Sequence, residues 1–279
     1  MRTVLICHRG ADFDRRGLAS WMLSFSDLVG IVEIDEPPER KKKRVRRELR
    51  RVGPLRMLDV LAFRVMYRLR HAAHDAAWEQ QVTERLQTCY PADLSQVPVH
   101  ETPSPNSKDT EAFLREIAPD LMIARCKSLL AERIFTIPDT GTFVLHPGLC
   151  PEYRNAHGGF WALANGHPED VATTLLKIDR GVDTGPIFGH YRTTFDSAAD
   201  SHIRIQQSTL LDNLPAVAEQ LRAIHSGSAV PINTAGRESA EWGQPWLTAY
   251  RRWKKHARRD AASANRPQPT GEGQPCPNN

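Results

Sequence analysis

Short apolar runs recur along the first half of the chain and predict buried strands separated by helices. Each run is rich in aliphatic and β-branched residues and is bounded by turn residues, which is typical of strands buried on both faces. The predicted strands are residues 3–7, 28–34, 97–100, 121–124 and 142–145. Residues 107–117 begin with Ser107 and predict a capped helix. The alternation indicates an α/β fold, with a Rossmann-like, mostly parallel sheet and helices on both faces.

A basic helical insert is predicted at about residues 38–88. Between Arg40 and Arg56 there are ten Lys and Arg residues against one acid, Glu48. Apolar residues recur at helical spacing through this segment: Val45, Leu49, Val52, Leu55, Leu58, Leu61, Val65 and Leu69. The pattern predicts an amphipathic helix with a solvated basic face. A rim for an anionic substrate and a nucleic-acid surface remain weaker interpretations, the last because no nucleic-acid motif accompanies the charges.

In the C-terminal third, the strand-like apolar runs give way to helical patterns, which predict a helical extension at residues 201–253. Residues 202–224 form an amphipathic pattern with an interruption expected at Pro215, and Gly227 ends it. Residues 242–253 are aromatic and are expected to dock on the body of a catalytic domain that spans residues 1–200. Residues 254–279 are polar and proline-rich, which predicts a disordered tail.

Composition narrows the class of protein. The first residues lack the features of a signal peptide, and no apolar stretch reaches the length of a membrane span. The five cysteines (Cys7, Cys89, Cys126, Cys150 and Cys276) are scattered, so we expect neither a disulfide framework nor a cysteine zinc site. The spacings of His157, His167 and His190 match no familiar metal-ligand pattern. These features predict a cytoplasmic enzyme without a metal or a membrane partner.

The residues with the clearest chemical potential lie between positions 141 and 187. His146 ends a predicted strand and is followed by Pro147 and Gly148, so its imidazole projects from a stiff turn. Asp183 lies in a glycine-rich loop. Ligands of parallel sheets collect at the carboxyl ends of strands, and a carboxylate fixes the tautomer of a nearby imidazole. The pair is either an acid–base pair or a structural hydrogen-bond pair.

Two linked motifs surround this pair. In order and spacing, the chain matches the pattern Asn-x-His-Pro-Ser-Leu-Leu-Pro-x-Tyr-Arg-Gly, then Trp-Ala-Ile, then Asp-x-Gly-x-Asp-Thr-Gly-Pro-Ile. The matching residues are His146, Pro147, Leu149, Pro151, Tyr153, Arg154, Trp161, Ala162, Asp179, Gly181, Asp183, Thr184, Gly185, Pro186 and Ile187. The segment resembles the formyltransferases that use 10-formyltetrahydrofolate, and the resemblance implies their fold.

The resemblance also implies an activity and a set of site residues. His146 would move the proton and stabilise the oxyanion, and Asp183 would orient His146. The residues implied around the folate donor are Arg125, Cys126, Lys127, Ser128, Leu176 and Asp179; Gly148 and Arg154 are implied around the acceptor. The acceptor is expected to be an amine of a small metabolite, such as an amino sugar or amino acid. Without a recognisable C-terminal barrel, a nucleic-acid acceptor is disfavoured, and a homodimer stays open.

Three of the departures from the family pattern bear directly on the site. Val144 replaces the family's Asn, an amide that stabilises the oxyanion. Asn155 is the nominated substitute, because it lies in the loop expected near His146. Hydrolysis of the formyl donor, or a catalytically altered or inactive folate-binding homologue, are the alternatives. Leu176 replaces a His on the donor side, and Gly148 replaces a Ser on the acceptor side.

Overall fold

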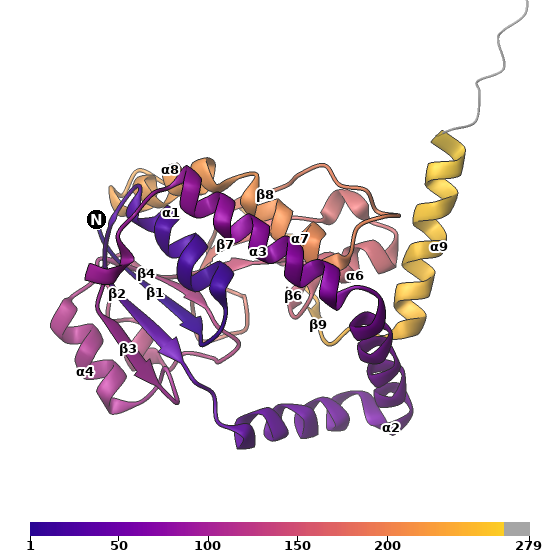
Figure 1. Ribbon diagram of the computed structural model, residues 1–279, viewed down its shortest axis with the longest axis horizontal. Helices are drawn as coiled ribbons and strands as arrows, with labels where there is room; N and C mark the ends of the chain where they lie inside the picture. Colours follow the sequence, from indigo (N-terminus) through magenta and orange to yellow (C-terminus); the bar gives the residue numbers. More distant parts are fainter. Residues whose placement is uncertain (265–279) are drawn as a thin grey trace, which may run out of the picture.

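The computed structural model describes residues 1–264, which are built around a seven-stranded sheet (Figure 1). The strands are β1 Arg2–His8, β2 Asp27–Ile34, β3 Val99–Thr102, β4 Leu121–Arg125, β5 Gly141–His146, β7 Thr173–Lys177 and β8 Ile187–Tyr191. Their order is β3-β2-β1-β4-β5-β7-β8; the pairs up to β4–β5 are parallel, and β7 and β8 add an antiparallel edge. The predicted fold class is confirmed.

Alternate residues of the strands supply two apolar faces, and each face is covered by helices. Leu5 and Cys7 belong to one core, which is closed by η1 Phe13–Leu18, α1 Ala19–Leu23, α3 Ala72–Cys89, α7 His202–Leu211 and α8 Leu214–His225. Val4 and Ile6 point to the other core, which is closed by α4 Lys108–Ile117 and α5 Glu132–Phe135. Ser107 caps α4 by accepting a hydrogen bond from the Thr110 N–H. Both strand faces are therefore buried, as the continuous apolar runs predicted.

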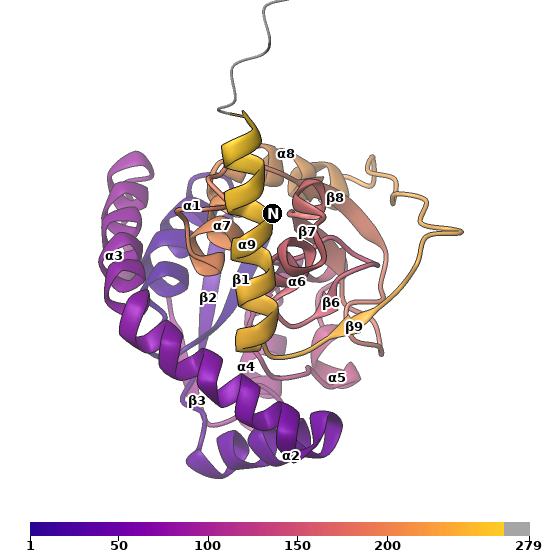
Figure 2. The ribbon, with the colours of Figure 1, turned by 90° about the vertical axis from the view of Figure 1, so that its right-hand side faces the viewer.

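The insert consists of α2 Pro38–Arg70 and α3, and α2 is bent at Gly53, where φ is 77°. We call residues 38–52 the first arm of α2 and residues 54–70 the second arm. The first arm runs along the outer edge of the molecule, away from the sheet (Figure 1). The second arm lies next to α9 Leu247–Ala264 (Figure 2), and it buries Met57, Val60 and Phe63 against the body.

The expectation of a disordered tail from residue 254 is wrong for residues 254–264. These residues continue α9, in which Ala249, Trp253 and Ala257 are buried against α6 Gly158–Asn165 and the second arm of α2. The spacing of these small and aromatic residues gives a narrow apolar stripe among many charges, so overall polarity concealed it. The expectation for residues 265–279 lies outside the described residues.

The remaining elements are short connections and one small second sheet. Residues 202–224 form two helices rather than one, since α7 ends before Asp212 and Pro215 lies in the first turn of α8. β6 Arg154–Asn155 pairs with β9 Glu241–Trp242, and η2 Leu94–Gln96 and η3 Pro168–Asp170 are single turns. Within residues 1–264, no helix combines the length and hydropathy that crossing a bilayer requires.

Candidate active site

His146 is the last residue of β5, and its side chain is almost completely buried between two hydrogen-bond acceptors. Its Nδ1 lies 3.3 Å from Asp183 Oδ2, and its Nε2 lies 2.8 Å from the Tyr153 carbonyl oxygen. A carbonyl oxygen can only accept, so Nε2 donates to it. Both ring nitrogens must carry a proton if both contacts are hydrogen bonds. The structure thus brings together the two residues that sequence analysis paired and adds a third, Tyr153, through its backbone.

Asp183 is held by its own loop and by the neighbouring strand. Its φ is 52°, a left-handed conformation that is uncommon outside glycine. Its Oδ2 accepts from the Asn155 N–H at 2.8 Å. Asp179 organises the same loop, because its Oδ1 accepts from the Gly181 N–H and the Thr184 hydroxyl. The Asn155 N–H therefore holds the same carboxylate oxygen that faces His146, and Asp179 braces the loop that carries Asp183.

Asn155 lies beside the pair, but its amide group is engaged elsewhere. The Asn155 Nδ2 donates to Glu241 Oε1 at 3.1 Å and to the Trp242 carbonyl at 2.7 Å. Since an amide nitrogen has two hydrogens, both are used in this structure. Only the backbone N–H of Asn155 contacts the candidate catalytic pair.

Gly148 is surrounded so closely that a side chain does not fit. A Cβ at this position would lie 2.6 Å from the Tyr153 oxygen, 2.8 Å from Gly158 Cα and 2.9 Å from His146 Nε2. The replacement of the family's Ser by Gly148 thus accompanies a tight packing of the turn behind His146. The space left by the missing side chain is filled by backbone.

We call residues 147–157, between β5 and α6, the catalytic loop. Arg154 joins this loop to the C-terminal segment. Its Nε donates to the Ser239 hydroxyl and its terminal nitrogen donates to the Val182 carbonyl. Beside it, Glu152 forms a bidentate ion pair with Arg237. The aromatic residues 242–253 were expected to dock on the body, but no sequence signal indicated that the residues just before them would brace this loop.

The residues predicted around the folate donor lie at the ends of β4 and β7. Arg125 Nε contacts Asp14 at 2.9 Å, and a terminal nitrogen of Arg125 donates to the Leu145 carbonyl next to His146. Lys127 N–H donates to His8 Nε2 at 3.0 Å. Other predicted residues differ in exposure: Leu176 is buried, whereas Cys126 and Ser128 are half-buried. Burial raises the pKa of the Cys126 thiol to about 11.

Val144 lies two residues before His146, so both side chains point to the same face of β5. It packs in a small apolar cluster with Cys150, Leu176 and Ile187. Burial raises the pKa of the Cys150 thiol, so this thiol stays protonated near neutral pH, as expected of an inert packing residue.

His157, which the sequence suggested only as a metal ligand, belongs to a packed group of rings beside the catalytic loop. His202 is packed among Phe63, Tyr67 and Phe160, and its ring centre is 5.6 Å from that of His157. Burial lowers the pKa of His157 to about 4 and that of His202 well below its usual value. Both rings are therefore neutral at pH 7.

These two histidines predict a loss of stability in mild acid. In the unfolded chain each ring takes up a proton as the pH falls below about 6.5, whereas the folded protein resists this until near pH 4 for His157. The unfolded state then binds more protons, so the free energy of unfolding falls. Denaturant unfolding at pH 7 and pH 5 measures this fall. His202→Phe keeps a ring and should reduce the fall; an equal fall in both proteins would contradict the explanation.

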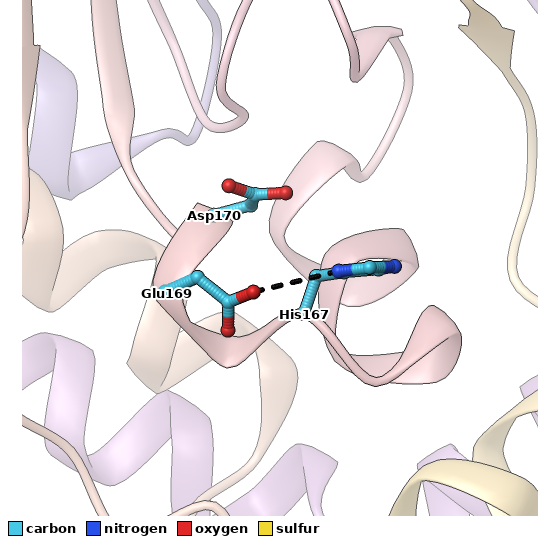
Figure 3. A group of neighbouring side chains, drawn as sticks. All are labelled: His167, Glu169 and Asp170. Carbon is cyan, nitrogen blue, oxygen red and sulfur yellow. Dashed lines mark ion pairs between the residues drawn. The ribbon is translucent and has the colours of Figure 1, made fainter.

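Among the described residues, one group of side chains has the composition and spacing to bind a cation. Figure 3 shows His167, Glu169 and Asp170 around the turn that follows α6. Their ligand atoms lie within 4.8 Å of one another, and His167 Nδ1 is 3.4 Å from Glu169 Oε1. The group is at the opposite end of α6 from the catalytic loop, and exposed acidic residues commonly cluster without an ion.

Comparison of the sequence with known proteins points to one family. Residues 77–214 match the model of the family described as Formyl transferase. The methionyl-tRNA formyltransferase of Mycobacterium sp. (strain KMS) is 36% identical over 116 residues, which cover 40% of this chain and 37% of that protein. The chain thus aligns with little more than a third of that relative.

Solved structures of similar fold include two formyltransferases. A sugar N-formyltransferase from Shewanella sp. FDAARGOS_354 has a TM-score of 0.53 at 12% identity, covering 92% of this chain and 88% of that one. A phosphoribosylglycinamide formyltransferase from Anaplasma phagocytophilum has a TM-score of 0.51 at 14% identity, covering 88% and 99%. At these identities they support the fold alone. The family assignment rests on the sequence matches, which identify residues 77–214 as a member of the formyltransferase family.

Proposed function

We propose that this protein is an N-formyltransferase that moves the formyl group of 10-formyltetrahydrofolate onto an amine of a small metabolite, such as an amino sugar or amino acid. The observation that carries the proposal is the contact of His146 with Asp183 at the carboxyl end of β5. Family membership supplies the reaction class. The scattered cysteines, of which Cys7 and Cys150 are buried free thiols, agree with a cytoplasmic enzyme.

In this proposal His146 and Asp183 divide the proton chemistry. The side chain of His146 is 4% exposed and that of Asp183 15%, so reactants approach along the edge that Asp183 forms. Asp183 accepts the proton that the amine loses. In the reaction, His146 exchanges the contact of its Nε2–H with the Tyr153 carbonyl for a contact with the substrate. Protonated His146 then stabilises the negative charge on the formyl oxygen through Nε2–H and gives that proton to the leaving nitrogen. The contact of Nδ1 with Asp183 keeps the ring in place.

The segments proposed to hold the folate donor are residues 125–128 and 177–183. They are tied together, because Arg180 in the second segment forms a bidentate ion pair with Glu132 of α5, which follows the first. Lys127 and the half-buried Arg154 are cations at this edge that suit the carboxylates of a folate or an anionic acceptor. 10-Formyltetrahydrofolate supplies a formyl group that its own nitrogen has already activated.

Val144 stands where the family has an Asn, so the amide that would stabilise the oxyanion is missing. This replacement favours two alternatives, a formyltetrahydrofolate hydrolase and an inactive folate-binding homologue. An oxyanion donor is typically worth about 2.7–4 kcal/mol, and the Asn155 amide is occupied by Glu241 and Trp242. Under the transferase proposal, His146 carries this charge stabilisation, and Asn155 acts through the backbone N–H that positions Asp183.

Incubation of the pure protein with 10-formyltetrahydrofolate separates these functions. We expect release of tetrahydrofolate only when an amine acceptor is present. The change in absorbance that accompanies release measures it. Panels of amino sugars and amino acids serve as acceptors, and mass spectrometry identifies a formylated product. Release without acceptor would support the hydrolase instead. Folate binding without release under either condition would support the inactive homologue.

A further inference from the structure

The second arm of α2 has two apolar faces, and only one of them packs on the protein. Val60, Met57 and Phe63 are buried on the inner face. Leu55, Leu58, Val65 and Leu69 are 84%, 64%, 59% and 80% exposed. Because successive helix residues turn by about 100°, these four lie on the side opposite to Val60. The sequence pattern had placed them on the apolar face of an amphipathic helix, and the structure leaves them in solvent.

The first arm of α2 adds a dense positive charge to this apolar stripe. Arg44 and Arg51 form ion pairs with Glu36 and Glu48. Among residues 1–264, no acidic partner is found within ion-pair distance of the following cations of the arm: Arg40, Lys42, Lys43, Arg46, Arg47 and Arg50. Val45 and Leu49, one helical turn apart, are also large exposed apolar residues. Apolar and basic side chains therefore occur together along both arms.

We infer that α2 binds the surface of a membrane that contains anionic lipids. A helix with leucines on one face and Lys and Arg beside them lies in the headgroup region, where its apolar face enters the acyl boundary. Clusters of Lys and Arg on such a helix are attracted by the negative charge of the lipids. Arg68 and Arg70 flank the leucine stripe, so their guanidinium groups can reach the headgroup level when the stripe is inserted.

Two other occupants fit the same residues less well. A nucleic acid would neutralise the cations through its phosphates but would leave the four exposed aliphatic side chains of the second arm without a partner. A second copy of this chain would cover those side chains, but it would bring two strongly basic helices together, which repel each other. Only an anionic lipid surface satisfies both the charge and the apolar stripe. The earlier expectation of no membrane partner rested on the lack of a membrane-spanning segment, which peripheral binding does not need.

Sedimentation of the full chain with vesicles tests the inference, independently of the formyltransferase reaction. We expect the protein to pellet with vesicles of phosphatidylcholine and phosphatidylglycerol, and to stay in solution with phosphatidylcholine alone. Leu58→Gln/Val65→Gln/Leu69→Gln should lower the apparent affinity roughly tenfold or more, since less apolar surface is inserted. Arg46→Gln/Arg47→Gln/Arg50→Gln should lower it as well and reduce its dependence on salt.

A matched control replaces exposed apolar residues elsewhere on the surface. Leu129 and Val230 are 63% and 80% exposed and lie outside α2, so Leu129→Gln/Val230→Gln should pellet like the unaltered protein. All the replaced side chains face solvent, and circular dichroism verifies that the variants fold. The inference is overturned if the protein stays in solution with both kinds of vesicle. It is also overturned if Leu58→Gln/Val65→Gln/Leu69→Gln pellets as well as the unaltered protein. It is also overturned if sedimentation velocity shows a dimer that this variant dissociates, or if a labelled RNA binds while the vesicles do not.

Discussion

His146→Ala is expected to lower the turnover number by about 10²- to 10⁴-fold while the KM for 10-formyltetrahydrofolate changes little. The imidazole contacts the reacting atoms in the proposed reaction, and the predicted donor-binding segments remain in place without it. Steady-state kinetics with a responsive acceptor measure both constants. Turnover unchanged by this substitution would exclude the His146–Asp183 pair as the catalytic centre.

Two further variants separate catalysis from structure at this position. Removal of the ring leaves the Tyr153 carbonyl without its donor, and a buried unsatisfied group costs about 1–3 kcal/mol, so the free energy of unfolding must be measured too. His146→Asn retains an amide donor but cannot transfer a proton, and it should be nearly as inactive. His167→Ala, on the far turn, should keep the activity of the unaltered protein.

Trp161→Ala is expected to lower the free energy of unfolding by about 3–5 kcal/mol, the usual range for a fully buried large aromatic side chain. Trp161 is 1% exposed, and its Nε1 donates to the Gly243 carbonyl at 2.9 Å. Its ring centre lies 4.9 Å from that of Trp242 and 4.6 Å from that of Trp246. It therefore anchors the C-terminal segment onto α6. Unfolding in denaturant, monitored by far-ultraviolet circular dichroism, measures the loss.

The same anchor reaches the candidate active site, because Trp242 also stacks on Tyr153, whose carbonyl holds His146. Activity should therefore fall together with stability. Trp161→Phe keeps an aromatic ring and removes only the N–H, so a smaller loss of stability is expected. A loss equal to that of Trp161→Ala would show that the hydrogen bond, and not the packing, is the anchor.

The strands and the candidate pair were accessible from sequence because their signals are local. Continuous apolar runs identify strands that are buried on two faces, and Pro147 and Gly148 indicate a turn after His146. The loop around Asp183 likewise needs glycine at position 185, where a Cβ would lie 1.9 Å from the Lys177 oxygen. The pairing of His146 with Asp183 as catalytic residues came from the resemblance of the two motifs to the formyltransferases.

The partners of side chains were not accessible, because they come from segments distant in the chain. From the sequence, the side-chain amide of Asn155 was expected to stabilise the oxyanion. In the folded protein β9 lies beside it, and the amide donates to Glu241 and Trp242 instead. Burial of α9 was hidden for the same reason, since Trp253 and Ala257 become a core only where α6 lies beneath them.

The amino-acid sequence by itself determined five of the seven strands of the main sheet and nominated the two residues of the candidate pair, because periodicity and short motifs depend on neighbours in the chain. The antiparallel strands β7 and β8 were not predicted. The tertiary structure decided which of the apolar faces of α2 is buried. A helical pattern identifies an apolar face but not its partner. In the second arm, Val60 meets the body and Leu58 meets solvent. That choice depends on where the bend at Gly53 and the packing of α9 place the helix.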